Sequence, residues 1–453
     1  MRIIVAGCGK LGTLITENLV QEGNNVSVID KDEQALDKLS DNLDVLTVKG
    51  SCVSVSTLEE ADIRHTDILI ATTISDETNM LCCLIGKKMG AKYTCARIRD
   101  PEYLGSLNFI TGELGLDNIV NPDRATAREI SRMLRLPFAS GIETFSRGLV
   151  EMVEIRVGKS EIYSDIPLNQ LYTRYKDMPH VLFCAVERDG KALIPKRDFV
   201  IREGDSVFVC ADPATVTAFF RYAGKNTRSA KDALIVGGSR IAYYLAGLLS
   251  ESHVKTKIIE LDSEKAHRLD EELNDTIVIE GDGTDRQFLL SEGLKTCDAF
   301  ITLTGRDEEN IMAGLYARTV NNGQVIVKNN RANYTQLLSE MGFDGVISPT
   351  RIACNIILRA VRARANSGSS SVERMYKIMN DRAEAIEFIA ANGASYLGRP
   401  LSELKIDDDA IVAVIVHDNK VHVPFGKDVI QSGDRVLIVT KDKGVKDLAD
   451  VLE

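Results

Sequence analysis

The sequence has no tryptophan, few aromatic residues and no long apolar run. Aromatic residues make up 6% of its 453 residues, which argues against sites built from stacked rings, such as those for carbohydrates or quaternary amines. No stretch approaches the roughly 18 apolar residues of a membrane-spanning helix. Acidic residues outnumber basic ones, and the formal net charge of -11 disfavours binding to nucleic acid or unaided adhesion to anionic lipid.

Chemical motifs are equally scarce. The nine cysteines are scattered and include no CxxC pair, so neither a zinc ribbon nor a thioredoxin-like site is indicated. Their pattern is typical of reduced thiols in a cytoplasmic protein. The six histidines form no recognisable acid–base group, and there is no HExxH, GxSxG or GxxxxGK[ST] motif. We therefore expect neither a catalytic centre nor a metal site.

The sequence does contain a repeat that extends along the whole chain. The segment "IIVAGCGKLG" returns as "ALIVGGSRIA", which places Gly7 on Gly237 at an offset of 237 − 7 = 230. Downstream, "TDILIATTISDETNM" aligns with "CDAFITLTGRDEENI" at 298 − 67 = 231, and "EGDSVFV" aligns with "SGDRVLI" at 433 − 204 = 229. Because chance would not keep the register over such a length, we interpret the chain as a tandem duplication.

Each half of the repeat divides into two parts. In the first part, short Val- and Ile-rich runs alternate with helical stretches, a pattern that predicts a parallel sheet. The second part is shorter and richer in strands. The predicted fold class is α/β, a tandem duplication of a Rossmann-like doubly wound parallel-sheet domain followed by a small α+β lobe. Ser-Gly stretches near 138–148 and at 366–371 separate the parts, and the four predicted domains are residues 1–136, 143–227, 231–364 and 371–453.

The first glycine turn, "GCGKLG", has the spacing of a dinucleotide-binding turn. Gly7 permits a tight turn, Gly9 lets backbone N–H groups approach a pyrophosphate, and Gly12 lets the following helix pack closely on the strand. The next strand, "NVSVID", ends in Asp30, where a carboxylate accepts hydrogen bonds from ribose hydroxyls and repels a 2′-phosphate. We therefore expect an NAD-like or ATP-like ligand, although the neighbouring Lys31 softens this discrimination.

The second glycine turn, "GGSRIA", departs from this pattern. It keeps Gly237 and Gly238, but Ser239 and Ala242 stand where the first turn has glycines. Glu260 keeps the ribose carboxylate. Two interpretations remain open, a second occupied nucleotide site or a scaffold copy that no longer binds.

Residues at the ends of other strands are further candidates. Ligands of open parallel sheets lie outside the carboxyl ends of the strands, so Ser51 and Asp282 either flank an adenine or belong to ordinary turns. The turn at Thr72–Thr73 is placed to touch a ribose. Arg97 and its counterpart Lys328 end equivalent strands, and a cation at this place suits a polyphosphate.

The order of these motifs, including "ARIRDPEY" and the "REGDSVFV" segment, resembles the regulator-of-potassium-conductance (RCK) domains. In its duplicated form the chain resembles the family of regulatory subunits of Trk potassium-uptake systems. The resemblance covers essentially the whole chain. It implies a cytoplasmic protein, peripheral on the inner face of the cell membrane, that binds NAD(H), with ATP or ADP as further candidates. It also implies a homo-oligomeric ring beneath a membrane-embedded potassium transporter subunit.

Matching by motif, the resemblance implies two sets of cofactor-binding residues. The first set is Gly7, Cys8, Gly9, Lys10, Leu11, Asp30, Thr73, Ile74 and Arg97. The second set is Gly237, Gly238, Ser239, Arg240, Ile241, Glu260, Thr304, Gly305 and Lys328. Gly12, Lys31, Ser51, Cys52, Thr72 and Asp282 complete the candidates.

The expected function is sensing without catalysis. A dehydrogenase needs a substantial second domain to hold its substrate over the nicotinamide and a base near the reacting carbon, and the lobes here are small. We expect bound nucleotide to shift a conformational equilibrium that a partner reads. The alternatives are an NAD-dependent oxidoreductase with an unrecognised substrate pocket and a cytosolic ligand-sensing scaffold with no membrane partner.

Overall fold

The computed structural model describes residues 1–106, 116–225, 230–331, 338, 341–366, 372–379, 382–442, 445 and 447–452. The predicted linker at 366–371 lies outside these residues except for its first position, as do the predicted domain ends at 227, 371 and 453. Contacts divide the chain into two compact units, each drawn from both halves of the repeat. One unit is Met1–Arg135 with Ser229–Leu358, and the other is Leu136–Arg228 with Arg359–Glu453.

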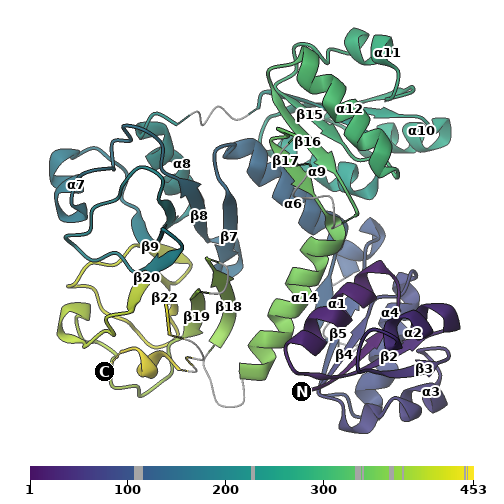
Figure 1. Cartoon of the computed structure of the whole chain (residues 1–453), viewed down its shortest axis with the longest axis horizontal. Coiled ribbons are helices and arrows are strands. Elements are labelled where there is room, and N and C mark those ends of the chain that lie inside the picture. Colours follow the sequence, from purple (N-terminus) through teal and green to yellow (C-terminus); the bar gives the residue numbers. More distant parts are fainter. Residues whose placement is uncertain are drawn as a thin grey trace. The chain divides into compact units, whose positions relative to one another are not determined.

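The first unit contains two parallel sheets. In the first sheet the strand order is β3-β2-β1-β4-β5-β6, and each neighbouring pair is parallel, as in a dinucleotide-binding fold. Helices cover both faces of the sheet (Figure 1), which is why a central strand such as β4, "ILIA", is apolar throughout. The elements are β1 (Arg2–Ala6), α1 (Lys10–Gln21), β2 (Asn25–Asp30), α2 (Glu33–Ser40), β3 (Leu46–Lys49), α3 (Val55–Glu60), η1 (Ile63–His65), β4 (Ile68–Ala71), α4 (Asp76–Met89), β5 (Tyr93–Arg97), η2 (Pro101–Ser106), β6 (Asn118–Val120) and α6 (Pro122–Arg135).

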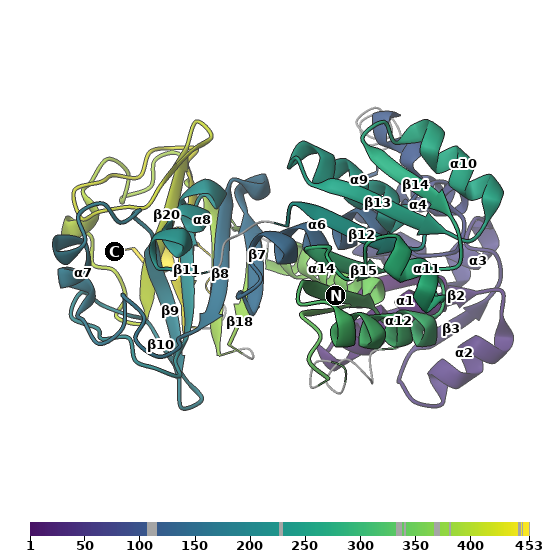
Figure 2. The ribbon, with the colours of Figure 1, turned by 90° about the horizontal axis from the view of Figure 1, so that it is seen from above.

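The second sheet repeats this plan in the order β14-β13-β12-β15-β16-β17. Leu245 of α9 and Leu269 of α10 are buried on one face, and Leu289 of α11 and Ala313 of α12 on the other (Figure 2). The predicted fold class is therefore confirmed. The elements are β12 (Asp232–Val236), α9 (Arg240–Glu251), β13 (Lys255–Glu260), α10 (Ser263–Glu272), β14 (Thr276–Glu280), α11 (Arg286–Ser291), β15 (Ala299–Thr302), α12 (Asp307–Val320), β16 (Gln324–Lys328), β17 (Gly345–Ile347) and α14 (Pro349–Asn366).

Helix α6, the last helix of the first sheet's domain, packs against the second domain. Ala127, Ile130 and Leu134 on one face of α6 are buried in the same apolar cluster as Leu245 of α9. These positions are three and four residues apart, the spacing of an amphipathic stripe. The stripe joins the two domains of this unit, because it is buried against a helix from the other half of the chain.

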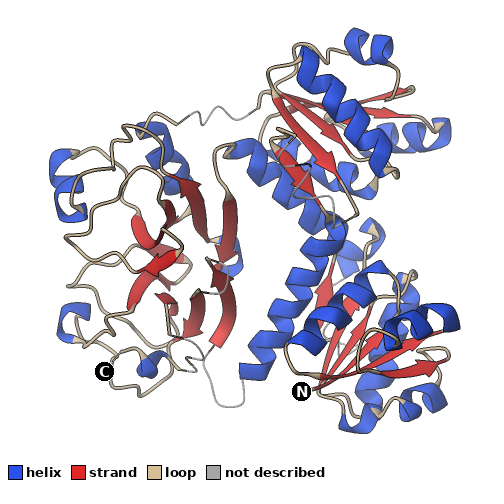
Figure 3. Cartoon of the chain, in the orientation of Figure 1, coloured by secondary structure: helices blue, strands red, loops and turns tan. Residues whose placement is uncertain are grey.

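The second unit contains two antiparallel sheets with equivalent strand orders, β7-β8-β11-β9-β10 and β18-β19-β22-β20-β21. Strands predominate over helices in both lobes, as Figure 3 shows. The first lobe contains β7 (Gly141–Phe145), η3 (Ser146–Gly148), β8 (Val150–Arg156), α7 (Leu168–Arg174), β9 (Leu182–Arg188), β10 (Lys191–Leu193), β11 (Ser206–Ala211) and α8 (Pro213–Tyr222). The second contains β18 (Val372–Ile378), β19 (Ala383–Ile389), η5 (Leu401–Glu403), β20 (Ala410–His417), β21 (Lys420–His422), β22 (Arg435–Thr440) and η6 (Leu448–Asp450).

The two lobes share one apolar core. Phe145 and Met152 of the first lobe and Tyr376 and Leu437 of the second are buried in a single cluster. The rings of Phe145 and Tyr376 meet edge to face with centroids 5.3 Å apart, a preferred geometry for aromatic pairs. Among the described residues, no helix combines the length and the apolar character that crossing a bilayer requires.

Candidate nucleotide-binding site

The first glycine turn has a separate steric reason for each of its three glycines. Gly7 has a φ of +106°, and a Cβ on it would lie 3.0 Å from the backbone of Thr72 and Thr73. A Cβ on Gly12 would lie 1.8 Å from the carbonyl oxygen of Gly7, so the strand and α1 are in direct backbone contact there. A Cβ on Gly9 would meet no described atom within 4 Å. Gly9 therefore leaves open the side on which a pyrophosphate would approach the backbone.

The N-terminus of α1 is uncapped. Gly9 is its N-cap residue, and no side chain among the described residues accepts a hydrogen bond from the N–H groups of the first turn. Such free N–H groups, together with the helix dipole, attract an anion. Lys10, at the first helical position, is exposed, whereas Leu11 is 6% exposed and packs into the domain. Only the backbone of Leu11 is therefore available to a ligand.

Asp30 lies at the end of β2, beneath this turn. One of its carboxylate oxygens accepts a hydrogen bond from the N–H of Cys8 at 2.5 Å, and the other accepts one from the N–H of Asp32 at 2.9 Å. A carboxylate oxygen has more than one acceptor site, so Asp30 keeps the capacity to accept hydrogen bonds from ribose hydroxyls. Lys31, the next residue, is exposed.

The turn after β4 is held by a buried asparagine. The side chain of Asn79 accepts a hydrogen bond from the N–H of Thr73 at 2.8 Å and donates to the carbonyl oxygens of Thr73 and Arg97 at 3.2 and 2.9 Å. The hydroxyl of Thr73 donates to Asn79 at 2.7 Å, and that of Thr72 donates to the carbonyl oxygen of Ala6 at 3.3 Å. Both hydroxyls thus support the turn itself. Ile74, 94% exposed, is its outermost side chain.

Arg97, at the end of β5, has one buried donor without a protein acceptor. Its terminal nitrogen donates to the carbonyl oxygen of Thr73. Its Nε atom is buried and finds no hydrogen-bond partner among the described residues. Burial also lowers the pKa of Arg97. A buried donor of this kind costs free energy unless it is paired, so a ligand oxygen at this place would be stabilised.

The side chains of the candidates after β3 are buried or half-buried. Cys52 is 6% exposed and belongs to the apolar core beneath the sheet. The hydrogen bond between its thiol and that of Cys82 lowers the pKa of Cys52. Ser51 is half-buried. In the second domain, the carboxylate of Asp282 accepts hydrogen bonds from the N–H and hydroxyl of Thr284 at 2.8 and 2.7 Å, which is an ordinary local turn.

The second glycine turn keeps the backbone geometry of the first, but a serine side chain caps its helix where the first turn has a glycine. Gly237 has a φ of +95°, and a Cβ there would lie 2.9 Å from the N of Thr304. Glu260 accepts a hydrogen bond from the N–H of Gly238 at 2.7 Å. The hydroxyl of Ser239 caps α9 by accepting from the N–H of Ala242 at 3.4 Å.

The neighbouring residues of the second domain also repeat the first. Asn310 accepts a hydrogen bond from the N–H of Thr304 at 2.9 Å and donates to the carbonyl oxygen of Lys328 at 3.1 Å, as Asn79 does in the first domain. Lys328 is 7% exposed, and burial lowers its pKa. Gly305 has open space where a Cβ would lie, and Ile241 is 4% exposed and packs into the domain.

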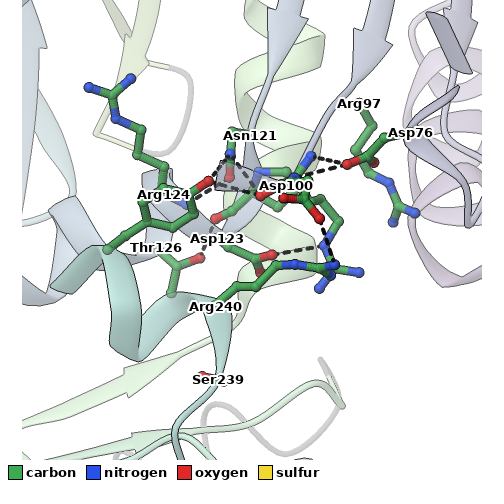
Figure 4. A network of polar contacts seen from close by, with 12 residues as sticks. Asp76, Arg97, Asp100, Asn121, Asp123, Arg124, Thr126, Ser239 and Arg240 are labelled. Atoms are coloured by element: carbon green, nitrogen blue, oxygen red, sulfur yellow. Dashed lines mark hydrogen bonds and ion pairs between the residues drawn. The ribbon is translucent and has the colours of Figure 1, made fainter. Parts of the chain in front are cut away.

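A network of polar contacts links the first site to the second domain (Figure 4). Asp76, at the start of α4, accepts hydrogen bonds from the backbone N–H groups of Arg99 and Asp100 at 2.8 and 2.9 Å. Arg99 then donates through Nε to Asp123 of α6 at 2.8 Å, and Asp123 is 4% exposed. Arg99 and Asp100 are two and three residues after Arg97, so this network begins close in the chain to the candidate phosphate-binding side chain.

The second domain joins the network through α9. Arg240, the residue after Ser239, forms an ion pair with Asp100 at 3.3 Å. The hydroxyl of Tyr244 donates to the carbonyl oxygen of Arg99 at 2.9 Å and accepts from the amide of Asn121 at 3.0 Å. The motif assigns Arg240 to a ligand of the second turn, but the structure places its side chain against the first domain.

Sequence reasoning assigned no role to several of these residues. Asn79 and Asn310 carry a signal, because both stand at the 310 − 79 = 231 offset of the repeat. Arg99 and Tyr244 carry none, because Asn330 and Leu14 occupy their places in the other copy. Their roles depend on the packing of α6 against α9.

These features define a protein with two dinucleotide-binding-type α/β domains in tandem, each followed by a small lobe. The TrkA-N domain family matches residues 3–122 and 233–349, and the TrkA-C domain family matches residues 152–224 and 385–453. The chain belongs to the TrkA family of Trk-system potassium uptake proteins.

Two relatives match almost their full length. The chain is 29% identical to the Trk system potassium uptake protein TrkA of Haemophilus influenzae, and 30% identical to that of Vibrio alginolyticus. Each match covers 98% of this chain and 96% of the relative. Among solved structures, the GsuK channel bound to NAD matches with a TM-score of 0.65 at 17% identity, over 98% of this chain and 77% of that one. This last likeness concerns the fold alone.

Proposed function

We propose that this chain is the nucleotide-sensing regulatory subunit of a potassium-uptake system and that it controls a separate membrane-embedded transporter without catalysis of its own. The observation that carries the proposal is the first glycine turn. Its helix N-terminus is uncapped, Gly9 leaves space above it, and the buried Nε of Arg97 lacks an acceptor among the described residues. All three features suit a polyphosphate. The oxidoreductase alternative receives no support from the family match.

The proposed ligand is NAD(H), with ATP or ADP as the second candidate. Asp30 favours a ribose with free hydroxyls, because a 2′-phosphate would be repelled by its carboxylate. The turn and Arg97 contact the parts that all these nucleotides share, so they do not discriminate between a dinucleotide and a mononucleotide. Solved neighbours in the fold are named as bound to NAD and as bound to ADP, so each candidate has such a neighbour.

Transmission of the signal begins at Arg97. A ligand on Arg97 would bias the position of Arg99 and Asp100, two and three residues further along the chain. These two residues are held by Asp76 and contact α9 through Tyr244 and Arg240. Nucleotides that differ in their contacts with Arg97 would favour different arrangements of the two domains. A ligand shifts such an equilibrium only by its differential affinity, commonly about 1–3 kcal/mol.

Binding is tested first, by calorimetry with NAD+, NADH, ATP and ADP. Asp30→Ala is expected to weaken binding of every nucleotide by about tenfold or more, because a charge-assisted hydrogen bond to ribose is lost. Asp44→Ala, which removes an exposed carboxylate from the same domain, is the matched control. Unchanged affinities in Asp30→Ala would refute the site.

Regulation is tested by potassium flux through the reconstituted transporter. Flux is measured with this chain and each nucleotide added in turn, and the nucleotide-dependent change is expected to disappear in Asp30→Ala.

Co-purification with membranes, with and without nucleotide, tests the proposed place on the inner face. Light scattering tests the proposed homo-oligomeric ring. Flux that does not respond to any nucleotide would refute a regulatory role and favour the scaffold alternative.

A further inference from the structure

The carboxylate beside each glycine turn accepts hydrogen bonds from equivalent backbone N–H groups. Asp30 accepts from the N–H of Cys8 and from that of Asp32. Glu260 accepts from the N–H of Gly238 at 2.7 Å and from that of Asp262 at 3.1 Å. The two sites are therefore a matched pair, and any further contact made by only one of them is informative.

The first difference is a cation on the carboxylate of the second turn. The ammonium of Lys265, in the first turn of α10, lies 2.7 Å from Glu260 and donates to the same oxygen that accepts from Gly238. In the first domain the equivalent position, at 265 − 230 = 35, is Ala35. Lys265 thereby takes one of the acceptor sites of Glu260 that a ribose hydroxyl would use. A ribose must therefore compete with Lys265 in the second turn and has no such competitor in the first.

The second difference lies at the helix N-terminus. The Ser239 hydroxyl accepts from the N–H of Ala242, so the protein's own oxygen takes a place that a phosphate oxygen would take. Gly9 leaves the equivalent N–H groups of α1 without a side-chain acceptor in the described part of the chain. A phosphate would have to displace Ser239 in the second turn.

The third difference concerns the basic residue that ends the fifth strand of each sheet. The ammonium of Lys328 donates to the carbonyl oxygen of Leu303 at 3.3 Å. Its counterpart Arg97 also donates to a backbone carbonyl oxygen, that of Thr73, but its buried Nε has no acceptor among the residues that the structure describes. The carboxylate and the helix N-terminus of the second domain thus have a contact that the first domain lacks, and the cation of the first domain keeps one unused donor.

We propose that Lys265 and Ser239 occupy the ribose and phosphate positions of the second turn, so that the chain binds one nucleotide, in the first turn only. Lys265 and Ser239 are thereby the residues that set the affinity difference between the two sites. This inference rests on the proposed function, because it assumes that the first turn binds an NAD-type nucleotide. Of the two interpretations of the second turn, an occupied nucleotide site or a scaffold copy that no longer binds, it selects the scaffold copy.

The test is the number of NAD+ molecules bound per chain, measured by equilibrium dialysis on the full chain. The wild type is expected to bind one, and Asp30→Ala is expected to need at least about tenfold more NAD+ to do so. The double variant Lys265→Ala/Ser239→Gly, which gives these two positions the residues of the first domain, is expected to bind two. In the background of Asp30→Ala this double variant binds one, at the second turn. Lys265→Ala is tolerable because Asp30 stands beside Ala35 without a cation.

The reciprocal variant tests the same groups in the first turn. Ala35→Lys/Gly9→Ser is expected to weaken NAD+ binding at the first turn by at least about tenfold, the ratio that corresponds to one lost charge-assisted contact.

Thermal unfolding of each variant identifies those that fail to fold. If the double variant Lys265→Ala/Ser239→Gly is one of them, the single variants Lys265→Ala and Ser239→Gly replace it. Two molecules bound by the wild type, or one bound by a folded double variant, would overturn this inference alone. No binding by any variant would overturn the proposed function as well.

Discussion

The hydroxyl of Tyr244, in the second nucleotide-binding-type domain, lies 2.9 Å from the backbone carbonyl oxygen of Arg99, in the first. Arg99 stands two residues after Arg97, and Tyr244 five residues after Ser239. One hydrogen bond therefore connects the strand end of the first candidate site to the helix that starts at the second glycine turn. Because Arg99 also pairs with Asp123, both its backbone and its side chain are held at the contact between the domains.

Removal of this hydroxyl should loosen the contact between the two domains. Tyr244→Phe leaves the carbonyl of Arg99 without this donor and the amide of Asn121 without an acceptor that it uses. The free energy of unfolding is expected to fall by about 1 kcal/mol, the usual net value of a hydrogen bond. Denaturant unfolding measures this loss. Tyr243→Phe, in the neighbouring position, is the control and should have an effect close to zero.

Two glycines of the first turn should separate folding from binding. Gly12→Ala places a Cβ 1.8 Å from the carbonyl oxygen of Gly7, and the resulting overpacking should cost about 1–3 kcal/mol of stability. Gly9→Ala meets no described atom within 4 Å and has ordinary backbone angles, so its melting temperature should stay near that of the wild type. Nucleotide affinity should nevertheless fall, because the new methyl lies on the open side of the turn. A Gly9→Ala protein that binds NAD+ as tightly as the wild type would contradict this site.

Replacement of the two buried asparagines should separate an effect on stability, expected in both domains, from an effect on nucleotide binding, expected in the first domain only. Asn79→Ala removes the side chain that holds Thr73 and the backbone of Arg97, and about 2–3 kcal/mol of stability should be lost, since buried backbone groups lose their partners. Asn310→Ala should cost a similar amount in the second domain. Only Asn79→Ala should also weaken nucleotide binding at the first turn, as measured by calorimetry below the melting temperature. Equal binding losses in both variants would argue against a role specific to the first site.

The two lobes should respond differently to pH. In the first lobe, Arg188 pairs with the buried carboxylate of Asp205 at 2.7 and 2.8 Å. In the second, at the offset 417 − 188 = 229, His417 pairs with the buried carboxylate of Asp434 at 2.6 Å. The hydrogen bond and the charge of Asp434 raise the pKa of His417 above 6.5, with Asp418 adding to the shift and Lys420 opposing it.

The folded protein holds the proton on His417 more tightly than the unfolded chain does. The pairing of His417 with Asp434 therefore stabilises the folded protein fully below pH 6.5. This stabilisation is lost as the pH rises through the raised pKa. Protection of the backbone N–H groups at residues 431–434 against hydrogen exchange should therefore fall as the pH rises above 6.5, after correction for the intrinsic rate. His417→Arg should remove this slope, and Arg188→His should create one in the first lobe. A slope that persists in His417→Arg would show that another group is responsible.

Much of the fold could be predicted from the sequence because its signals are local. The apolar runs of the parallel strands and the spacing of Gly7, Gly9 and Gly12 are set by the geometry of one strand, one turn and one helix. The position of Asp30 at the end of the next strand follows from the same unit. Its hydrogen bond with the N–H of Cys8 places it where the motif requires.

Other parts of the site could not be predicted, because they depend on partners from distant segments. The motif alone assigned Arg240 to the second turn, yet the side chain pairs with Asp100 of the first domain. The hydroxyl of Thr72 was a candidate for ribose contact, but it donates to backbone oxygens of the glycine turn. Each side chain can reach several acceptors, and only the packed structure selects one.

The amino-acid sequence by itself determined that this protein is a duplication, with two glycine turns of unequal composition and a strand-rich lobe after each. Those features need only a periodic pattern of apolar residues and glycines at fixed spacing. The tertiary structure decided that α6 packs on α9, that Lys265 covers Glu260 while Asp30 has no such cation, and that Arg99 joins the two domains. An apolar stripe or a charged side chain shows that a partner is needed, but only the folded chain brings one within contact distance.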